Sequence, residues 1–358
     1  MFSEEMERRA AIRALLHRIV EQFVAHEAHG HTELRQFERL AGDLIDVTDS
    51  EVAATIAEPL CRHPDTPPAL IRRFFDRGGA CARIAFEFAP APVADIIANA
   101  EHGSAELAAA IARRAELPRE AISALAARSE GVALYALAAN RQIHLDAAAL
   151  RALSQVARDD QALARLLLDR EDIDIDPEPL FLAATRGERA KIVLAACRSA
   201  FIGGTGDSWS PGDEKLAERL DALAALQERD AIIARVADAL DARKSRVRKI
   251  FRDEGGEALA LTCVALGLDI ETATRLLLGG GMAFASDVAR IRALRALMSS
   301  TPRRAAARII AAINGSGRFD REPARRVGWR EDPSTQAGAA RRGAADRSVH
   351  RRTNFDQH

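Results

Sequence analysis

The chain has 358 residues, a formal net charge of −1, 4% aromatic residues and four cysteines. A chain of this length exceeds one average domain, and a net charge near zero excludes a large overall field that would steer the whole molecule to nucleic acid or a membrane. The sequence is rich in Ala, Leu, Arg and Glu, which are strong helix formers and predict an almost wholly helical protein.

Residues 1–47 are predicted to form a helical hairpin that caps the rest of the fold. Apolar residues recur at spacings of three and four over residues 4–28 and again over residues 33–45, which is typical of amphipathic helices. The chain starts with an acidic stretch and has no apolar run of the roughly 18 residues that a membrane span needs. We therefore expect no signal peptide, no membrane interaction and a cytoplasmic location.

Residues 48–200 carry the strongest pattern, a Pro or Asp that begins a helix at each repeat. Apolar or small residues follow each of these positions three, four and seven residues later, and second helices are expected over residues 105–114, 132–140 and 161–169. Such self-similarity is typical of stacked helix pairs. We therefore expect an all-α fold, an α-α superhelix formed by a degenerate HEAT-like helical repeat array. The five predicted helix starts are Pro67, Pro90, Pro118, Asp146 and Pro177.

Side-chain oxygens next to these starts are predicted to cap the helices. Thr48 and Glu51 have the spacing of a capping box, and Thr66 and Asp176 each directly precede a proline. A proline in the first turn loses no hydrogen bond, because an amide there has no partner within the helix. We therefore expect Thr48, Thr66 and Asp176 to accept hydrogen bonds from the first turns of their helices.

The C-terminal half is predicted to contain a linker, a second helical region and a tail. Residues 201–212 are glycine-rich, and residues 213–314 again show helical periodicity, with Thr301 before a proline as a further helix start. Residues 315–358 contain ten Arg against six Asp and Glu, which gives +4 and leaves −5 on residues 1–314 out of the net −1. This segment has little apolar surface to offset ordering entropy and is predicted to be a disordered Arg-rich tail.

The Leu-Pro and Leu-Asp helix starts at Pro118 and Asp146, together with residues 258–268 leading into Asp269, resemble a bacterial family of all-helical repeat proteins known as a domain of unknown function. The resemblance covers residues 35–314 and leaves out the tail. It implies a HEAT-like helical fold and supplies no catalytic residues.

A basic segment in the second helical region is the candidate binding face. On a helix it could neutralise phosphates, or it could match the acidic residues of the preceding segment, 213–230. The charges of such a helix more often face solvent or pair with acidic residues of the same molecule. Its six basic residues, uninterrupted by an acid, are Arg243, Lys244, Arg246, Arg248, Lys249 and Arg252.

Clustered histidines raise the question of a metal site. His26, His29 and His31 lie near the end of the first predicted helix, and His26 and His29 share a face. Imidazoles can ligate zinc, but the spacing is one residue short of the catalytic zinc motif. A histidine at a helix C-terminus is also favoured by the helix dipole. We expect adventitious metal binding at most.

Other clusters also lack the pattern of a known site. The acidic run over residues 169–178 lacks the central glycine and terminal glutamate of a calcium loop, and the glycines at 203–206 lack the partners of a phosphate loop. The four cysteines are scattered and contain no C-x-x-C pair, so they are predicted to be small buried hydrophobes. We therefore expect no cofactor and no metal.

A repeat array without a catalytic motif favours binding over catalysis, so we expect that the protein is not an enzyme. The leading hypothesis is a scaffold or adaptor that binds a protein partner on one face of the array. The alternative is a nucleic-acid-associated regulator that uses residues 243–252 and the Arg-rich tail. A third hypothesis is an enzyme whose catalytic residues carry no motif. The sequence sets neither the partner nor the oligomeric state.

Overall fold

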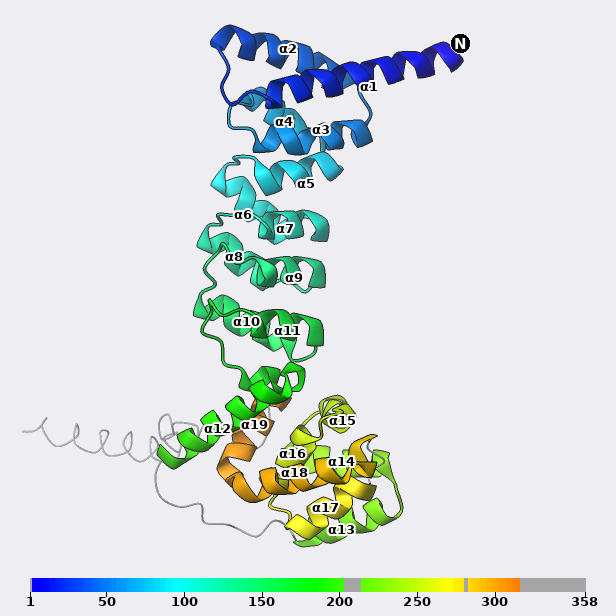
Figure 1. Cartoon of the computed structure of the whole chain (residues 1–358), viewed down its shortest axis with the longest axis vertical. Coiled ribbons are helices and arrows are strands. Elements are labelled where there is room, and N and C mark those ends of the chain that lie inside the picture. The colour runs from blue at the N-terminus through cyan, green and yellow to red at the C-terminus, as the bar shows by residue number, and fades with distance from the viewer. Residues whose placement is uncertain (1, 203–213, 280–282, 316–358) are drawn as a thin grey trace, which may run out of the picture.

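The computed structural model describes residues 2–202, 214–279 and 283–315. All regular structure in these ranges is helical, which confirms the all-α fold, and no helix within them is long and apolar enough to cross a membrane. The helices form a column, α1–α12, and a bundle, α13–α19, at one end of it (Figure 1). Most of the predicted linker and nearly all of the predicted tail lie outside the described residues.

The column is a stack of helix pairs in two layers. One layer holds α2 (His31–Val47), α4 (Pro68–Arg77), α6 (Val93–His102), α8 (Arg119–Ala126), α10 (Ala147–Ala157) and the 3-10 helix η1 (Glu178–Ala183). The other holds α1 (Phe2–Val24), α3 (Ser50–Arg62), α5 (Gly79–Phe88), α7 (Ala105–Ala112), α9 (Gly131–Ala139) and α11 (Gln161–Leu168), and α12 (Arg186–Ile202) follows. Contacts run mainly between neighbours, both within a pair and along a layer (Figure 1).

The predicted helix starts are correct at all positions but one. Pro67, Pro118, Asp146 and Pro177 directly precede α4, α8, α10 and η1. The prediction for Pro90 is wrong, because α6 begins only at Val93. The residue before a proline is pushed out of the α conformation, so the proline at 92 prevents a helix from starting two residues earlier.

The predicted caps are correct for the aspartate and wrong for the threonines. Asp49 and not Thr48 caps α3, so the expected capping box does not form. The hydroxyls of Thr48, Thr66 and Thr301 instead donate to a carbonyl oxygen of the preceding helix, at 2.6 to 2.7 Å. Another residue stands between each threonine and the first helical turn. Asp176 accepts from an amide of η1 at 3.0 Å, as predicted.

Polar side chains at helix ends tie most of the pairs to the one before, and we call them the carbonyl ladder. Each donates hydrogen bonds to the last carbonyls of the preceding helix in its own layer. Arg128, for example, donates to three carbonyl oxygens at the end of α6, at 2.8 to 3.1 Å. These carbonyls have no partner within their helix, and a cation there is favoured by the helix dipole. The ladder consists of Arg77, Arg114, Arg128, Asn140 and Arg170.

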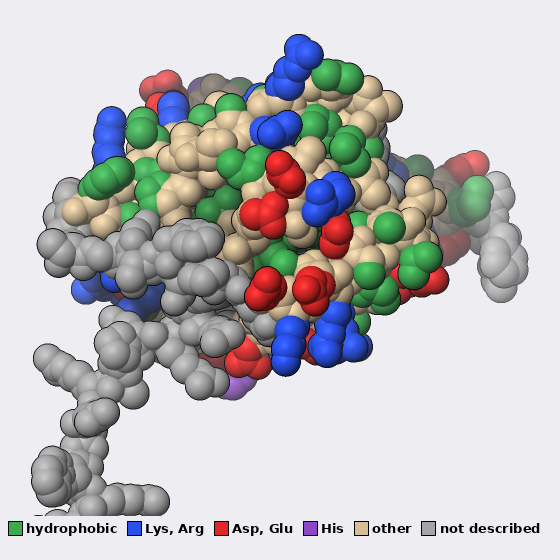
Figure 2. Space-filling model, turned by 90° about the horizontal axis from the view of Figure 1, so that it is seen from below, with side chains coloured by type: hydrophobic (Ala, Val, Ile, Leu, Met, Phe, Trp, Pro, Cys, Tyr) green, Lys and Arg blue, Asp and Glu red, His purple; other side chains and the backbone are tan. Residues whose placement is uncertain are grey.

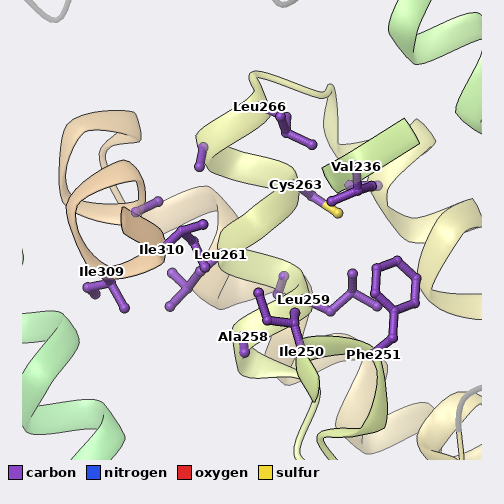
Figure 3. Packing of buried hydrophobic residues seen from close by; sticks show 14 of the residues in the cluster. Val236, Ile250, Phe251, Ala258, Leu259, Leu261, Cys263, Leu266, Ile309 and Ile310 are labelled. Atoms are coloured by element: carbon purple, nitrogen blue, oxygen red, sulfur yellow. The ribbon is translucent and has the colours of Figure 1, made fainter. Parts of the chain in front are cut away.

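The bundle is built around α16 (Glu257–Leu266), all but one of whose residues are buried. Figure 3 shows Leu259, Leu261 and Cys263 of this helix among side chains of its neighbours. The surrounding elements are α13 (Glu214–Ala225), α14 (Arg229–Leu240), α15 (Lys244–Arg252), α17 (Ile270–Gly279), η2 (Ala283–Ser286), α18 (Val288–Ser300) and α19 (Arg303–Asn314). The last of these, α19, also packs against η1 and α12, so it joins the bundle to the column.

Four charged side chains are buried where the column meets the bundle. Arg189 of α12 lies 2.7 Å from Asp253 and 2.8 Å from Glu257, and Arg290 of α18 completes the network by pairing with Glu257. Each of these side chains is at most 10% exposed. Buried charges are tolerated when every member has its partner, so this network fixes the orientation of α12 on the bundle.

Candidate functional site

The basic face predicted from the sequence lies on α15 and at the residue before it. Val247, Ile250 and Phe251 of this helix are buried in the core of the bundle. Residues at spacings of three and four share one face of a helix, so the basic side chains surround the side of α15 that the core does not cover.

The structure pairs three of the six basic side chains with carboxylates. Arg246 and Lys249 lie 2.5 and 2.7 Å from the two carboxylate oxygens of Asp159, in the turn between α10 and α11 of the column. Arg248 lies 3.6 Å from Asp230 of α14. The acidic partner anticipated in residues 213–230 is thus present, but the closer one comes from the column. The members without an ion pair within the described ranges are Arg243, Lys244 and Arg252.

The pairing also sets the protonation of Asp159. Burial by itself raises the pKa of this carboxyl, but the hydrogen bond from Lys249 and the charge of Arg246 outweigh it, and the pKa is lowered. Asp159 is therefore ionised at neutral pH. It ties α15 to the column rather than leaving the whole basic face free for a ligand.

The column opens between α4 and α6. These two helices belong to one layer but barely touch, whereas α6 and α8 pack closely. The gap is a groove of about 1190 Å³. The segment 89–92, which joins α5 to α6, borders it and contains two prolines, whose fixed backbone angles keep this wall extended. The break in the stack therefore leaves a depression in this layer.

The groove combines aromatic walls with charges of both signs at its rim. Phe75 and Phe86 are in edge-to-face contact with ring centroids 4.7 Å apart, and the guanidinium of Arg62 lies 3.7 Å from the centre of the Phe88 ring. Apolar centres with a polar rim are the usual composition of a protein interface. The rim residues on α4 and α6 are Arg72, Asp76, Asp95 and Asn99.

A second depression continues along the same layer between α6 and α8. It has a volume of about 990 Å³ and is lined by Ile97 of α6, Ser123 of α8 and the cap residue Asp146 of α10, among others. Its walls carry no aromatic side chain. The layer that contains α4 therefore presents two successive hollows, of which the first is the one with large apolar groups.

Of the clustered histidines, His26 and His29 lie with their ring centroids 6.2 Å apart. The side chain of His29 is 8% exposed and stacks on Phe23 with ring centroids 4.0 Å apart, and its Nδ1 lies 3.5 Å from Asp65. His26, two residues beyond the end of α1, hydrogen-bonds a carbonyl of that helix, and His31 is the first residue of α2. In the part of the chain that the structure describes, no group of three His, Cys, Asp or Glu is placed to hold a metal ion.

The cysteines and the acidic run have structural surroundings. Burial raises the pKa of both Cys61 and Cys263 to about 12, so both are thiols at neutral pH. In the acidic run, Asp169, Asp172 and Glu178 each pair with an arginine. The run therefore links parts of the fold, and its carboxylates do not gather into one site.

Sequence reasoning missed the groove between α4 and α6. A signal was present, since four of the 13 phenylalanines lie between residues 74 and 88, immediately before prolines at 90 and 92. Several aromatic residues next to a connection with two prolines indicate a place where the helix stack is interrupted and its exposed side chains are apolar. The helical periodicity alone places these aromatic residues in the core.

A family model described as an uncharacterised protein conserved in bacteria (DUF2336) matches residues 92–196. The matched segment runs from the start of α6 into α12. This confirms the resemblance to a bacterial helical family of unknown function, over a shorter segment than the 35–314 expected from the sequence. No curated protein and no solved structure matches the chain.

Proposed function

We propose that the protein is a cytoplasmic scaffold whose helix column binds a segment of another protein in the groove between α4 and α6. The observation that carries the proposal is the opening of the helix stack at this point. The groove of about 1190 Å³ exceeds the roughly 300–1,000 Å³ of typical small-molecule pockets. It has the size for a short helical or extended segment.

The groove also offers a defined chemistry to such a segment. The side chains of Phe75 and Phe88 supply apolar area for an aliphatic or aromatic anchor. Arg72, Asp76 and Asp95 have no ion pair within the described ranges, so their charges are available to a partner. We infer a partner segment that carries an apolar side chain flanked by both an acidic and a basic residue.

The construction of the column favours a preformed site. The carbonyl ladder fixes the pairs on both sides of the break, with Arg77 at the end of α4 and Arg128 bound to the end of α6. A groove held by its scaffold loses little conformational freedom on binding. Stacked helix pairs of the HEAT-like type use such surfaces for recognition, and the proposal assigns the protein binding rather than catalysis.

The nucleic-acid alternative has less support. Three of the six basic side chains of residues 243–252 are already paired with carboxylates. At the bundle end of the molecule, acidic and basic side chains are interspersed on the visible face (Figure 2). Affinity for nucleic acid grows with the number of phosphates that free cations neutralise, so this arrangement favours a protein partner.

The proposal is tested by exchanging the charges at the groove. The double variant Arg72→Glu/Asp95→Lys inverts the rim and leaves the net charge unchanged. The control Arg83→Glu/Glu106→Lys makes the same exchange at exposed positions of the opposite layer, on α5 and α7. After crosslinking in native lysate, purification and mass spectrometry, we expect one specific partner with the unaltered chain and the control, and its loss with the groove variant. Equal recovery with both variants would refute the groove as the site.

A further inference from the structure

A small pocket lies where the column meets the bundle, far along the chain from the α4–α6 groove. It has a volume of about 230 Å³, and its walls come from the α10–α11 turn, η1 and α15. Ala157, Ala164 and Leu180 give it an apolar lining. Its charged residues are Arg158, Asp159, Lys249, Arg252 and Asp253.

Both carboxylates of this pocket are already engaged. Asp253 accepts two hydrogen bonds from Arg189, at 2.7 and 2.9 Å, and one from the amide of Gly256 at 3.0 Å. Asp159 accepts from Arg246 and Lys249. Their negative charges are thus offset by partners, two of which, Arg189 and Arg246, do not line the pocket.

Among the described residues, two guanidinium groups of this pocket have no acceptor. The side chains of Arg158 and Arg252 form no hydrogen bond or ion pair within the described ranges, and Nε of Arg158 is shielded from solvent as well. A buried donor without an acceptor is costly, so this nitrogen is a group that a ligand would satisfy. Nη1 of Arg158 packs closely against Gly315 at the end of α19, so its side chain is held in place.

We propose that this pocket binds a phosphate group, as inorganic phosphate or as a small phosphomonoester, with Arg158 and Arg252 as its donors. The volume is below that of ordinary small-molecule sites and suits one compact oxyanion with few attached atoms. The lining carries three positive and two negative side chains, a sum of +1. The planar fork of a guanidinium matches phosphate oxygens in pairs.

The ligand would act on the joint between the two parts of the molecule. Arg158 belongs to the column and Arg252 to the bundle, so one phosphate between them adds a bridge across the junction. A ligand that binds only the folded junction stabilises it by mass action. The inference does not rest on the proposed function, because the pocket and the groove share no residue.

Calorimetric titration of the full chain with inorganic phosphate, and separately with phosphoserine, tests the inference. Sodium chloride at the same ionic strength corrects for screening. We expect saturable binding of at least one of the two probes, and the probe that binds more tightly identifies the source of the phosphate. Arg158→Met and Arg252→Met keep the apolar stem and should each weaken binding at least about tenfold, as expected for loss of a charged hydrogen bond. The control Arg292→Met, on the exposed face of α18, should bind as the unaltered chain does.

Circular dichroism establishes that each variant is folded, and Arg158→Lys provides a second, gentler change that keeps the charge and removes the fork. It should bind more weakly than the unaltered chain and more tightly than Arg158→Met. The inference is overturned if neither probe binds the folded chain at millimolar concentration. It is equally overturned if the variants at 158 and 252 bind as tightly as the control.

Discussion

The column and the bundle bury similar apolar side chains but connect them in different ways. In the column, helices contact mainly the members of their own and the adjacent pair, and the carbonyl ladder spans one repeat at a time. In the bundle, one helix, α16, is surrounded by elements from both sides of it in the sequence. The column is therefore a chain of local interfaces, whereas the bundle has a single shared core.

This difference explains where a binding groove can form. A stack tolerates a gap between two neighbours, such as α4 and α6, because the other layer still holds the pairs together through α5 and α7. A shared core tolerates such a gap less well, since α15, α17, α18 and α19 all pack on α16. The column can therefore contain a groove because its contacts are local, whereas the helices of the bundle pack closely because they share one core.

The largest effect is expected at the junction that couples the two parts. Arg189→Met leaves the carboxylates of Asp253 and Glu257 buried without this partner, which costs about 3–5 kcal/mol when a buried pair is broken. Urea denaturation should show this loss in the free energy of unfolding. Arg186→Met, one turn earlier on α12 and exposed, should change it by less than about 0.5 kcal/mol. Equal effects of the two substitutions would show that the network does not couple column and bundle.

Matched core truncations compare the two connectivities directly. Leu261 of α16 and Leu134 of α9 are both completely buried, and replacing either with Ala should cost about 2–5 kcal/mol. The two variants should differ in how many backbone amides lose protection from hydrogen exchange. Leu261→Ala should weaken the helices packed on α16, whereas Leu134→Ala should weaken only the adjacent pairs. Loss of protection along the whole column in the Leu134 variant would contradict a chain of local interfaces.

The carbonyl ladder is tested by two adjacent arginines. Arg114 donates to carbonyl oxygens of Phe86 and Ala89 at the end of α5, and Arg114→Met should cost about 1–3 kcal/mol because these acceptors lose their donor. Arg113 is half exposed and pairs with Glu87, at 3.3 Å, so Arg113→Met should cost about 0–1 kcal/mol. Thermal unfolding measures the loss of stability in each variant. A larger loss for Arg113→Met than for Arg114→Met would show that the ladder does not stabilise the column.

The smallest effect is a pH dependence at the lower end of the column. Arg165, and secondarily Thr185, stabilise the charged form of Glu188 and lower its pKa from 4.5 to about 2. A carboxyl whose pKa is lower in the folded state stabilises the fold above its unfolded pKa, and this stability is lost as the pH falls from about 5 to 2. Allowing for partial exposure, the contribution is about 1–2 kcal/mol.

Glu188→Gln should therefore flatten the decline in unfolding free energy between pH 5 and 2, whereas substitution of the exposed Glu171 by Gln should leave the decline unchanged. Urea titrations at a series of pH values provide the comparison. If the Glu188 variant keeps the full decline, the ion pair with Arg165 does not stabilise the contact between α11 and α12.

The sequence predicted features whose cause is local. Asp146 begins α10 because its own side chain accepts from the amides two and three residues later, and Pro118 begins α8 through its own backbone restriction. The errors at Pro90 and Thr48 are also local. In each case a residue one or two positions later, Pro92 or Asp49, stands directly before the helix and begins it instead. Positions of helices follow from such rules to within a few residues.

The site could not be predicted in the same way because its causes are distant in sequence. Arg128 finds its acceptors 25 to 28 residues earlier, and Asp159 meets α15 about 90 residues later. The groove exists because α4 and α6 barely touch, and no pattern within either helix shows this. Composition indicated the aromatic residues of segment 74–88, but only the stack shows that Phe75 and Phe88 face an opening.

Site-specific photocrosslinking tests the central claim, that the interrupted column binds a protein partner. A photoreactive residue is placed at position 91 in the groove wall, at exposed position 139 on the opposite layer and at position 244 on α15. We predict a crosslink to one defined partner from position 91 and none to that partner from positions 139 and 244. A partner captured from position 244, with none from position 91, would contradict the account and place recognition on the bundle.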